Sequence, residues 1–285
     1  MICKNNLFFS CEVIMIFMSC VSCIQNPQKG PLTKLTIENS LTRLENGDIQ
    51  FYYAVYKDSI GRNLSEDLKK KLTAGQLKRE FYVNKSDSIK EIRVSVIKND
   101  EDIFNEIQLR SAMGFPMKNF AFEKVNCKEI SEKINNSINK DQEARTFEDN
   151  KKNIIDIDKM NKNLIISIIE KCGWSRIDTS QVNDVFLLIQ HMESEYMARY
   201  YTIFLEFYKK GNLSSLNYAR MIDRLLMNYG FEQIYGTQVV DHSFYTIRDI
   251  KNVNKRRKQL RLEPIEQVAK KFGFEFKLSQ NEKNN

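Results

Sequence analysis

The segment Thr179–Gly211, TSQVNDVFLLIQHMESEYMARYYTIFLEFYKKG, decides the fold class. Its apolar residues recur every three or four positions, the spacing of one face of an α-helix. They are Val182, Val185, Phe186, Ile189, Met192, Tyr196, Tyr200, Ile203, Phe204 and Phe207. Globular helices typically run for about 8–20 residues. We therefore predict a break near His191–Ser194, and Gly211 ends the pattern.

Helices are also predicted on both sides of this segment. Their ends carry residues typical of helix termini: glycine after the last turn, and serine or proline at the start. The first runs from residue 158 to Cys172 and is stopped by Gly173. The second covers Ser215–Tyr229, with Ser214 as its cap and Gly230 as its stop. The last two cover Val253–Leu260 and a segment that starts near Pro264. Residues 231–250 show no clear period and predict a long ordered loop. The pattern indicates a helical domain over residues 126–278, with a disordered tail at 279–285.

The composition agrees with a helix-rich chain. The 285 residues include 10 glycines and 4 prolines, 14 in all, whereas average usage predicts about 34. This deficit disfavours collagen-like and turn-dense all-β folds. With 42% hydrophobic and 11% aromatic residues, the chain can bury a core, so wholesale disorder is excluded.

Residues 32–125 mix strand and helix patterns. Ile49–Tyr56 is rich in aromatic and β-branched residues and predicts a strand, whereas spaced leucines predict a helix over Ser65–Leu77. Arg79–Val83 and Ile89–Ile97 alternate apolar and polar residues around a turn-rich linker, which predicts a β-hairpin. The predicted fold class is mainly α: a helical C-terminal domain preceded by a small α+β region containing a β-hairpin.

The N-terminus resembles a bacterial lipoprotein signal. Lys4 precedes an apolar run over residues 7–21, and small residues then precede Cys20 and Cys23. The run is too short for a membrane span, which needs about 20 apolar residues. We predict a signal peptide over residues 1–22, lipidation of Cys23 with Cys20 as the alternative, and a tether over 23–31. A cleaved secretory signal without lipid, or no export, are the other readings.

Two further features bear on location and partners. Cys127 and Cys172 are the only cysteines after residue 23; they are either two buried apolar residues or a disulfide, if the compartment is oxidising. The net charge is +7, and Lys251–Arg261 holds six basic residues and no acid. We interpret it as a solvated helix, with Arg256 and Arg257 folded back onto the preceding loop as the next reading. We expect no nucleic-acid partner for an exported lipoprotein.

Five polar clusters in the helical domain are candidates for a site. They are Asp141-Gln142 with Arg145, Gln190-His191, Asp223-Arg224, Gln233 with Tyr235-Gly236-Thr237-Gln238, and Arg256-Arg257. With Gly173-Trp174 and Leu262-Glu263-Pro264, their order and spacing resemble an uncharacterised bacterial family, domain of unknown function 6624, over about residues 126–275. The resemblance implies a helical domain in which the motif residues converge, and no activity or substrate. Ser175 departs from the family, which commonly has proline after the tryptophan.

His191 is the candidate catalytic acid or base, because an unperturbed imidazole titrates at about pH 6.5. Asp223 or Asp141 would orient its ring. Arginine binds carboxylate or phosphate through paired hydrogen bonds, which makes an anion one option for the unknown ligand. The candidate binding residues are Asp141, Gln142, Arg145, Gln190, Arg224, Tyr235, Thr237, Gln238, Arg256 and Arg257.

The sequence therefore predicts an uncharacterised cell-envelope lipoprotein, attached to the membrane by its lipid, with a binding or structural role and a polar pocket around His191. The alternative is a hydrolase-like enzyme using His191 as general base or acid with Asp and Arg partners. The chain has no HExxH, GxSxG, GxxxxGK[ST] or GxGxxG motif, and we expect no cofactor. Two histidines in all argue against a His-rich metal site, so no metal ligand is predicted, although a carboxylate site stays open.

Overall fold

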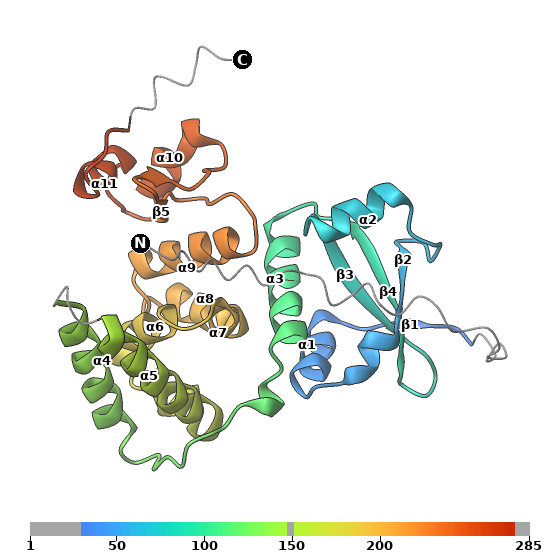
Figure 1. Ribbon diagram of the computed structural model, residues 1–285, viewed down its shortest axis with the longest axis horizontal. Coiled ribbons are helices and arrows are strands. Elements are labelled where there is room, and N and C mark those ends of the chain that lie inside the picture. Colours follow the sequence, from blue (N-terminus) through green and yellow to red (C-terminus); the bar gives the residue numbers. More distant parts are fainter. Residues whose placement is uncertain (1–29, 147–150, 277–285) are drawn as a thin grey trace, which may run out of the picture.

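The computed structural model describes residues 30–146 and 151–276, which form a sheet-containing N-terminal region and a helical region (Figure 1). The predicted signal peptide at 1–22, most of the tether and the tail at 279–285 lie outside the described residues. Among the described helices, none is long and apolar enough to cross a membrane.

The N-terminal region is a four-stranded sheet with helices. Its strand order is β1 (Thr33–Lys34), β3 (Leu77–Val83), β4 (Ile89–Val96) and β2 (Val55–Asp58). β3 pairs antiparallel with both β1 and β4, whereas β2 pairs parallel with β4. The helices are α1 (Ile37–Glu45), α2 (Glu66–Thr73) and α3 (Asp100–Gly114). The predicted β-hairpin is confirmed as β3–β4.

Two predicted boundaries in this region are wrong. Residues Ile49–Tyr53 form a 3-10 turn, and the strand begins only at Val55. The helix capped by Ser65 ends at Thr73, because Gly75 adopts a left-handed φ of +71° and turns the chain. Leu77, predicted at the end of that helix, is instead the fully buried first residue of β3.

Helix α3 connects the two regions. Ile103, Phe104 and Ile107 pack into the large core of the helical region, whereas Leu109 and Ala112 belong to the smaller core under the sheet. Figure 1 shows α3 between the sheet and the helices, and it contacts α1, β3 and α7. Because it serves two cores on different faces, it has no single apolar stripe for the sequence to reveal.

The helical region confirms the predicted mainly α domain. Its helices are α4 (Ile130–Thr146), α5 (Lys151–Cys172), α6 (Val182–Gln190), α7 (Ser194–Arg199), α8 (Tyr201–Lys209), α9 (Ser215–Asn228), α10 (Val253–Gln259) and α11 (Ile265–Lys271). The loop between α9 and α10 contains a two-stranded hairpin, β5 (Val239–Val240) with β6 (Ser243–Phe244). Short 3-10 turns lie at Met117–Asn119, Trp174–Arg176, Thr179–Gln181 and Ile250–Asn252.

The break predicted near His191–Ser194 is confirmed, since α6 ends at Gln190 and α7 begins at Ser194. A second break, at Tyr200, was not predicted. The turns let residues of all three helices reach one core, in which Phe186 and Phe204 meet edge to face with ring centroids 5.3 Å apart.

Cys127 and Cys172 form a disulfide. It ties the segment before α4 to Cys172, the last residue of α5 and two residues before Trp174. Of the two readings left open by the sequence, the disulfide is the one the structure contains. The other interpretation, in which both cysteines are separate buried apolar residues, is wrong, because Cys127 is exposed and Cys172 is half-buried.

Candidate functional site

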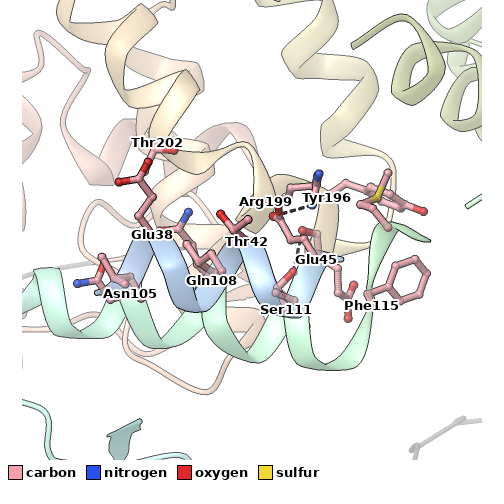
Figure 2. A pocket seen from close by; sticks show the side chains of 15 residues that line it. Glu38, Thr42, Glu45, Asn105, Gln108, Ser111, Phe115, Tyr196, Arg199 and Thr202 are labelled. Atoms are coloured by element: carbon pink, nitrogen blue, oxygen red, sulfur yellow. Dashed lines mark hydrogen bonds and ion pairs between the residues drawn. The ribbon is translucent and has the colours of Figure 1, made fainter. Parts of the chain in front are cut away.

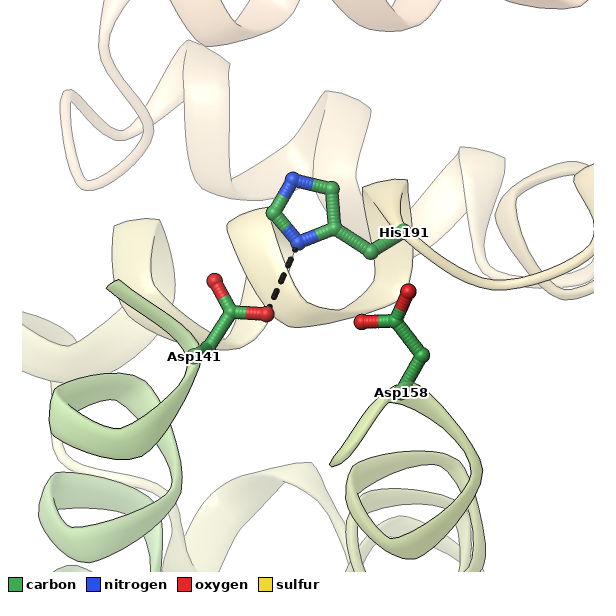
Figure 3. Close-up of side chains that lie close together, drawn as sticks. All are labelled: Asp141, Asp158 and His191. Carbon is green, nitrogen blue, oxygen red and sulfur yellow. Dashed lines mark hydrogen bonds and ion pairs between the residues drawn. The ribbon is translucent and has the colours of Figure 1, made fainter. Parts of the chain in front are cut away.

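His191 lies at the C-terminal end of α6, at the predicted break. Its Nδ1 is 3.1 Å from Oδ1 of Asp141, which α4 contributes (Figure 3). A carboxylate accepts, so Nδ1 carries the proton and Nε2 is left as the acceptor in the neutral ring. Asp141, rather than Asp223, is therefore the carboxylate that orients His191.

Asp141 is the centre of a charged network, although its side chain is only 1% exposed. It also accepts hydrogen bonds from Gln142 Nε2 at 2.8 Å and from Arg145 Nη2 at 3.0 Å. Burial favours a higher pKa for Asp141, but the hydrogen bonds and positive charges of His191 and Arg145 outweigh it and hold the pKa below its usual range. The carboxylate is thus ionised at neutral pH.

Asp158 of α5 joins this network through Arg145, whose Nη2 contacts the Asp158 carboxylate as well as that of Asp141. Burial raises the pKa of Asp158 despite the charge of Arg145. Asp158 was not among the sequence-predicted residues. No motif marks it, and only the fold places α5 beside α4.

Asp141, Asp158 and His191 also form a cluster of potential metal ligands, with one donor atom from each within 4.8 Å of the others (Figure 3). Two carboxylates and an imidazole suit several divalent cations. No metal ligand was predicted from the sequence, which left a carboxylate site open. Arg145 contacts both carboxylates, so a cation and this guanidinium would compete for the same oxygens.

The motif residues converge on one cavity of about 290 Å³, which we call the His191 pocket. It is bounded by α4, α6, α9, the loop after α9 and the end of α11. Seven sequence-predicted residues line it: Gln142, Arg145, Gln190, His191, Arg224, Thr237 and Gln238. Leu187, Arg220 and Phe272 complete the lining and were not predicted. Arg220 has a signal in retrospect, because it lies one helical turn before Arg224 and shares its face of α9.

Asp223 has a different role from the one predicted for a catalytic partner. It is fully buried, and its carboxylate accepts hydrogen bonds from the backbone N–H groups of Ile234, Tyr235 and Thr237 at 2.7–2.9 Å and from the Thr237 hydroxyl at 2.9 Å. Burial raises the pKa of Asp223, and these hydrogen bonds oppose the rise. Asp223 therefore shapes the loop that presents Thr237 and Gln238 to the pocket.

Arg256 and Arg257 fold back onto the same loop. Arg256 Nε donates to the carbonyl of Ile234 at 2.9 Å, and Arg257 Nη1 donates to that of Tyr235 at 2.6 Å. Arg257 is 2% exposed. Neither arginine lines the His191 pocket, so both support the loop. This confirms the second interpretation of the basic cluster, in which Arg256 and Arg257 fold back onto the preceding loop.

Tyr235 also lies outside the lining of the pocket. Its ring packs near that of Tyr218 with centroids 6.3 Å apart, and Tyr218 stacks on Tyr208. Burial raises the pKa of Tyr235. The glycine that follows, Gly236, has a left-handed φ of +69°, and a Cβ there would overlap Ile265, so the turn requires glycine.

A larger cavity, of about 380 Å³, lies between α1, α3 and α7 (Figure 2). An ion pair of 2.6 Å between Glu45 and Arg199 crosses it and joins α1 to α7. None of the motif residues lines this cavity in the described parts of the chain. The smaller His191 pocket is therefore the better candidate for a functional site.

Comparison with known proteins places the helical region in a family. No curated protein and no solved structure matches the chain. A family model described as a family of unknown function, DUF6624, matches residues 123–278, more than half of the chain. That span contains every residue that lines the His191 pocket. The chain therefore belongs to the DUF6624 family.

Proposed function

We propose that this chain is a lipid-anchored protein of the bacterial cell envelope whose DUF6624 domain binds a ligand in the His191 pocket. The observation that carries the binding role is the convergence of motif residues. Three sequence-distant clusters, at residues 142–145, 190–191 and 237–238, line a single cavity together with Arg224. Residues with purely separate structural roles have no reason to share one cavity.

The cell-envelope location is supported by the Cys127–Cys172 disulfide. Disulfides persist in oxidising compartments such as the periplasm or the cell surface and are rare in the cytosol. The lipid anchor rests on the sequence before Cys23. It predicts that Cys23→Ala abolishes labelling by an alkyne fatty-acid analogue in cells. Labelling that continues in Cys23→Ala but stops in Cys20→Ala would move the anchor to Cys20.

The binding role is tested by NMR of the two histidines, the only ones in the chain. His191 lies in the pocket, whereas His242 is exposed in the turn between β5 and β6. We expect a small-molecule fraction from cell extract to shift the imidazole signals of His191 and to leave those of His242 unchanged. His191→Ala assigns the signals. If every fraction leaves the His191 signals in place, or moves both histidines equally, the binding role is refuted.

A second candidate function is acid–base catalysis. The specific observation is that Asp141 holds Nδ1 of His191, which leaves Nε2 to exchange a proton with a ligand or water in the pocket. In that case turnover of p-nitrophenyl esters should fall at least about 100-fold in His191→Ala and should fall in Asp141→Asn. Turnover that is equal in wild type and His191→Ala would exclude it.

A further inference from the structure

The His191 pocket contains two arginines without an acidic partner. Arg220 makes no hydrogen bond or ion pair with any described residue, and Arg224 donates only to neutral oxygens: the Gln190 carbonyl at 2.8 Å and Gln238 Oε1 at 3.3 Å. Both side chains are half-buried. Burial lowers the pKa of each guanidinium, and the positive charge of Arg220 lowers that of Arg224 further.

No carboxylate lines the pocket within the described ranges. The nearest carboxylates, Asp141 and Asp158, are not part of the pocket lining, and each is already paired with Arg145. Arg220 and Arg224 therefore place two positive charges on one face of α9, and no described carboxylate pairs with either of them. Like charges one helical turn apart destabilise a helix in the absence of a counter-ion, so this arrangement favours an anion that bridges both.

One further polar group in the pocket has no partner. Gln190 Oε1 is buried and makes no hydrogen bond with the described residues, and Gln190 lines the cavity. A buried polar atom in this state costs free energy that a ligand recovers. A ligand hydroxyl can donate to this oxygen, or the amide can rotate and donate to an anion.

We infer that the His191 pocket binds a phosphate monoester, with the phosphoryl oxygens on Arg220 and Arg224 and the organic group against Leu187 and Phe272. This rests on the proposed function. A phosphate monoester carries a charge of about −1.5 to −2 at neutral pH, which matches the two unpaired arginines, whereas a single carboxylate leaves one of them unbalanced. Its oxygens lie around one atom, so one group reaches both guanidinium ions.

The probe for this inference is phenyl phosphate, titrated into the full-length protein by NMR of the two histidines and by calorimetry. Benzoate and phenol carry the same phenyl group, and succinate carries two negative charges, but none of the three has a phosphoryl group. We expect phenyl phosphate to shift His191 but not His242, and to bind at least about 10-fold more tightly than the other three. Equal or tighter binding of benzoate, succinate or phenol would overturn the phosphate assignment.

The variants are Arg220→Gln and Arg224→Gln, with Arg176→Gln as the control that removes one exposed positive charge from the same domain. Each pocket variant should weaken phenyl phosphate binding about 10-fold or more, because a charge-assisted hydrogen bond is lost. Arg176→Gln should bind like wild type. Arg220→Gln should be at least as stable as wild type without ligand, since a like-charge contact is removed. A destabilised Arg220→Gln variant with unchanged affinity would overturn the inference.

The source of the phosphate is decided by competition. Vesicles containing phosphatidic acid, whose headgroup is a phosphate monoester, should displace phenyl phosphate if the ligand is a lipid. If the ligand is a soluble molecule, they should not displace it, and inorganic phosphate should. If phenyl phosphate leaves His191 unshifted while an extract fraction still shifts it, the phosphate class fails and the binding role stands. If no fraction shifts His191 either, both fail.

Discussion

Removing the disulfide should destabilise the helical region by a calculable amount. The bond joins cysteines 45 residues apart in the sequence. In the chain-entropy model, closing a loop of this length removes about 13 cal/mol/K of entropy from the unfolded chain, which is about 4 kcal/mol at room temperature. The Cys127→Ser/Cys172→Ser double variant should therefore lose about 4 kcal/mol of unfolding free energy.

The assay follows the single tryptophan of the chain during urea unfolding. Trp174 packs against Tyr200, Phe204 and Phe207 in the helical core, so its fluorescence reports the unfolding of the region that the disulfide constrains. A slope of about 2 kcal/mol/M in urea converts the loss into a shift of about 2 M in the midpoint.

Reduction provides the control. Cys127 is exposed, so dithiothreitol should move the wild-type midpoint to that of the double variant and leave the double variant unchanged. A double variant whose unfolding free energy stays within about 1 kcal/mol of the oxidised wild type would refute the reasoning. It would mean that the unfolded chain is already constrained between α4 and α5 without the bond.

Two further predictions concern the carboxylates of the site. Asp223→Ala should lower the unfolding free energy by about 3 kcal/mol or more, because three backbone N–H groups lose the fully buried Asp223 carboxylate as their acceptor. Asp223→Asn keeps one oxygen and should lose less, and an unchanged urea midpoint in Asp223→Ala would contradict the role in the loop. Asp141→Asn should cost about 2 kcal/mol near pH 7. Because the pKa of Asp141 is lowered in the folded protein, its contribution is complete above the unfolded pKa of about 3.9 and is lost as the pH falls through the folded value. The difference from wild type should therefore shrink below about pH 4, and a difference that stays constant down to the most acidic pH would count against the His191–Asp141 pairing.

The sequence anticipates most of the helical region because its periodic segments end at strong local signals. Gly173 and Ser214 mark helix ends in both the sequence and the structure. The break beside His191 follows from the length of the apolar pattern alone. The break at Tyr200 has no signal in the sequence, because the apolar spacing continues through it. Only the structure reveals this break, at a residue that is buried in the core.

For the candidate site, the sequence found residues that lie in motifs and missed those that only the fold brings close. Asp158 and Phe272 join the site from α5 and the end of α11, and nothing in their local sequence separates them from ordinary surface residues. Arg220 of α9 is marked only by its position one helical turn before Arg224. The roles within the motifs also required geometry. Asp141 and Asp223 were both candidates to orient His191, and only the helix arrangement distinguishes the pocket carboxylate from the loop carboxylate.

Helix α3 has a practical consequence for work on this family. The family match begins at residue 123, after α3 has ended at Gly114, yet Phe104 of α3 stacks on Tyr201 of α8 with ring centroids 4.5 Å apart. A fragment that starts at the family boundary lacks Phe104 and would leave the Tyr201 ring and the neighbouring core exposed to solvent. Exposed apolar surfaces of this kind promote aggregation. Expression of the helical region of this chain therefore calls for a start before Asn99, the residue that caps α3, so that its core is produced together with the helix that covers it.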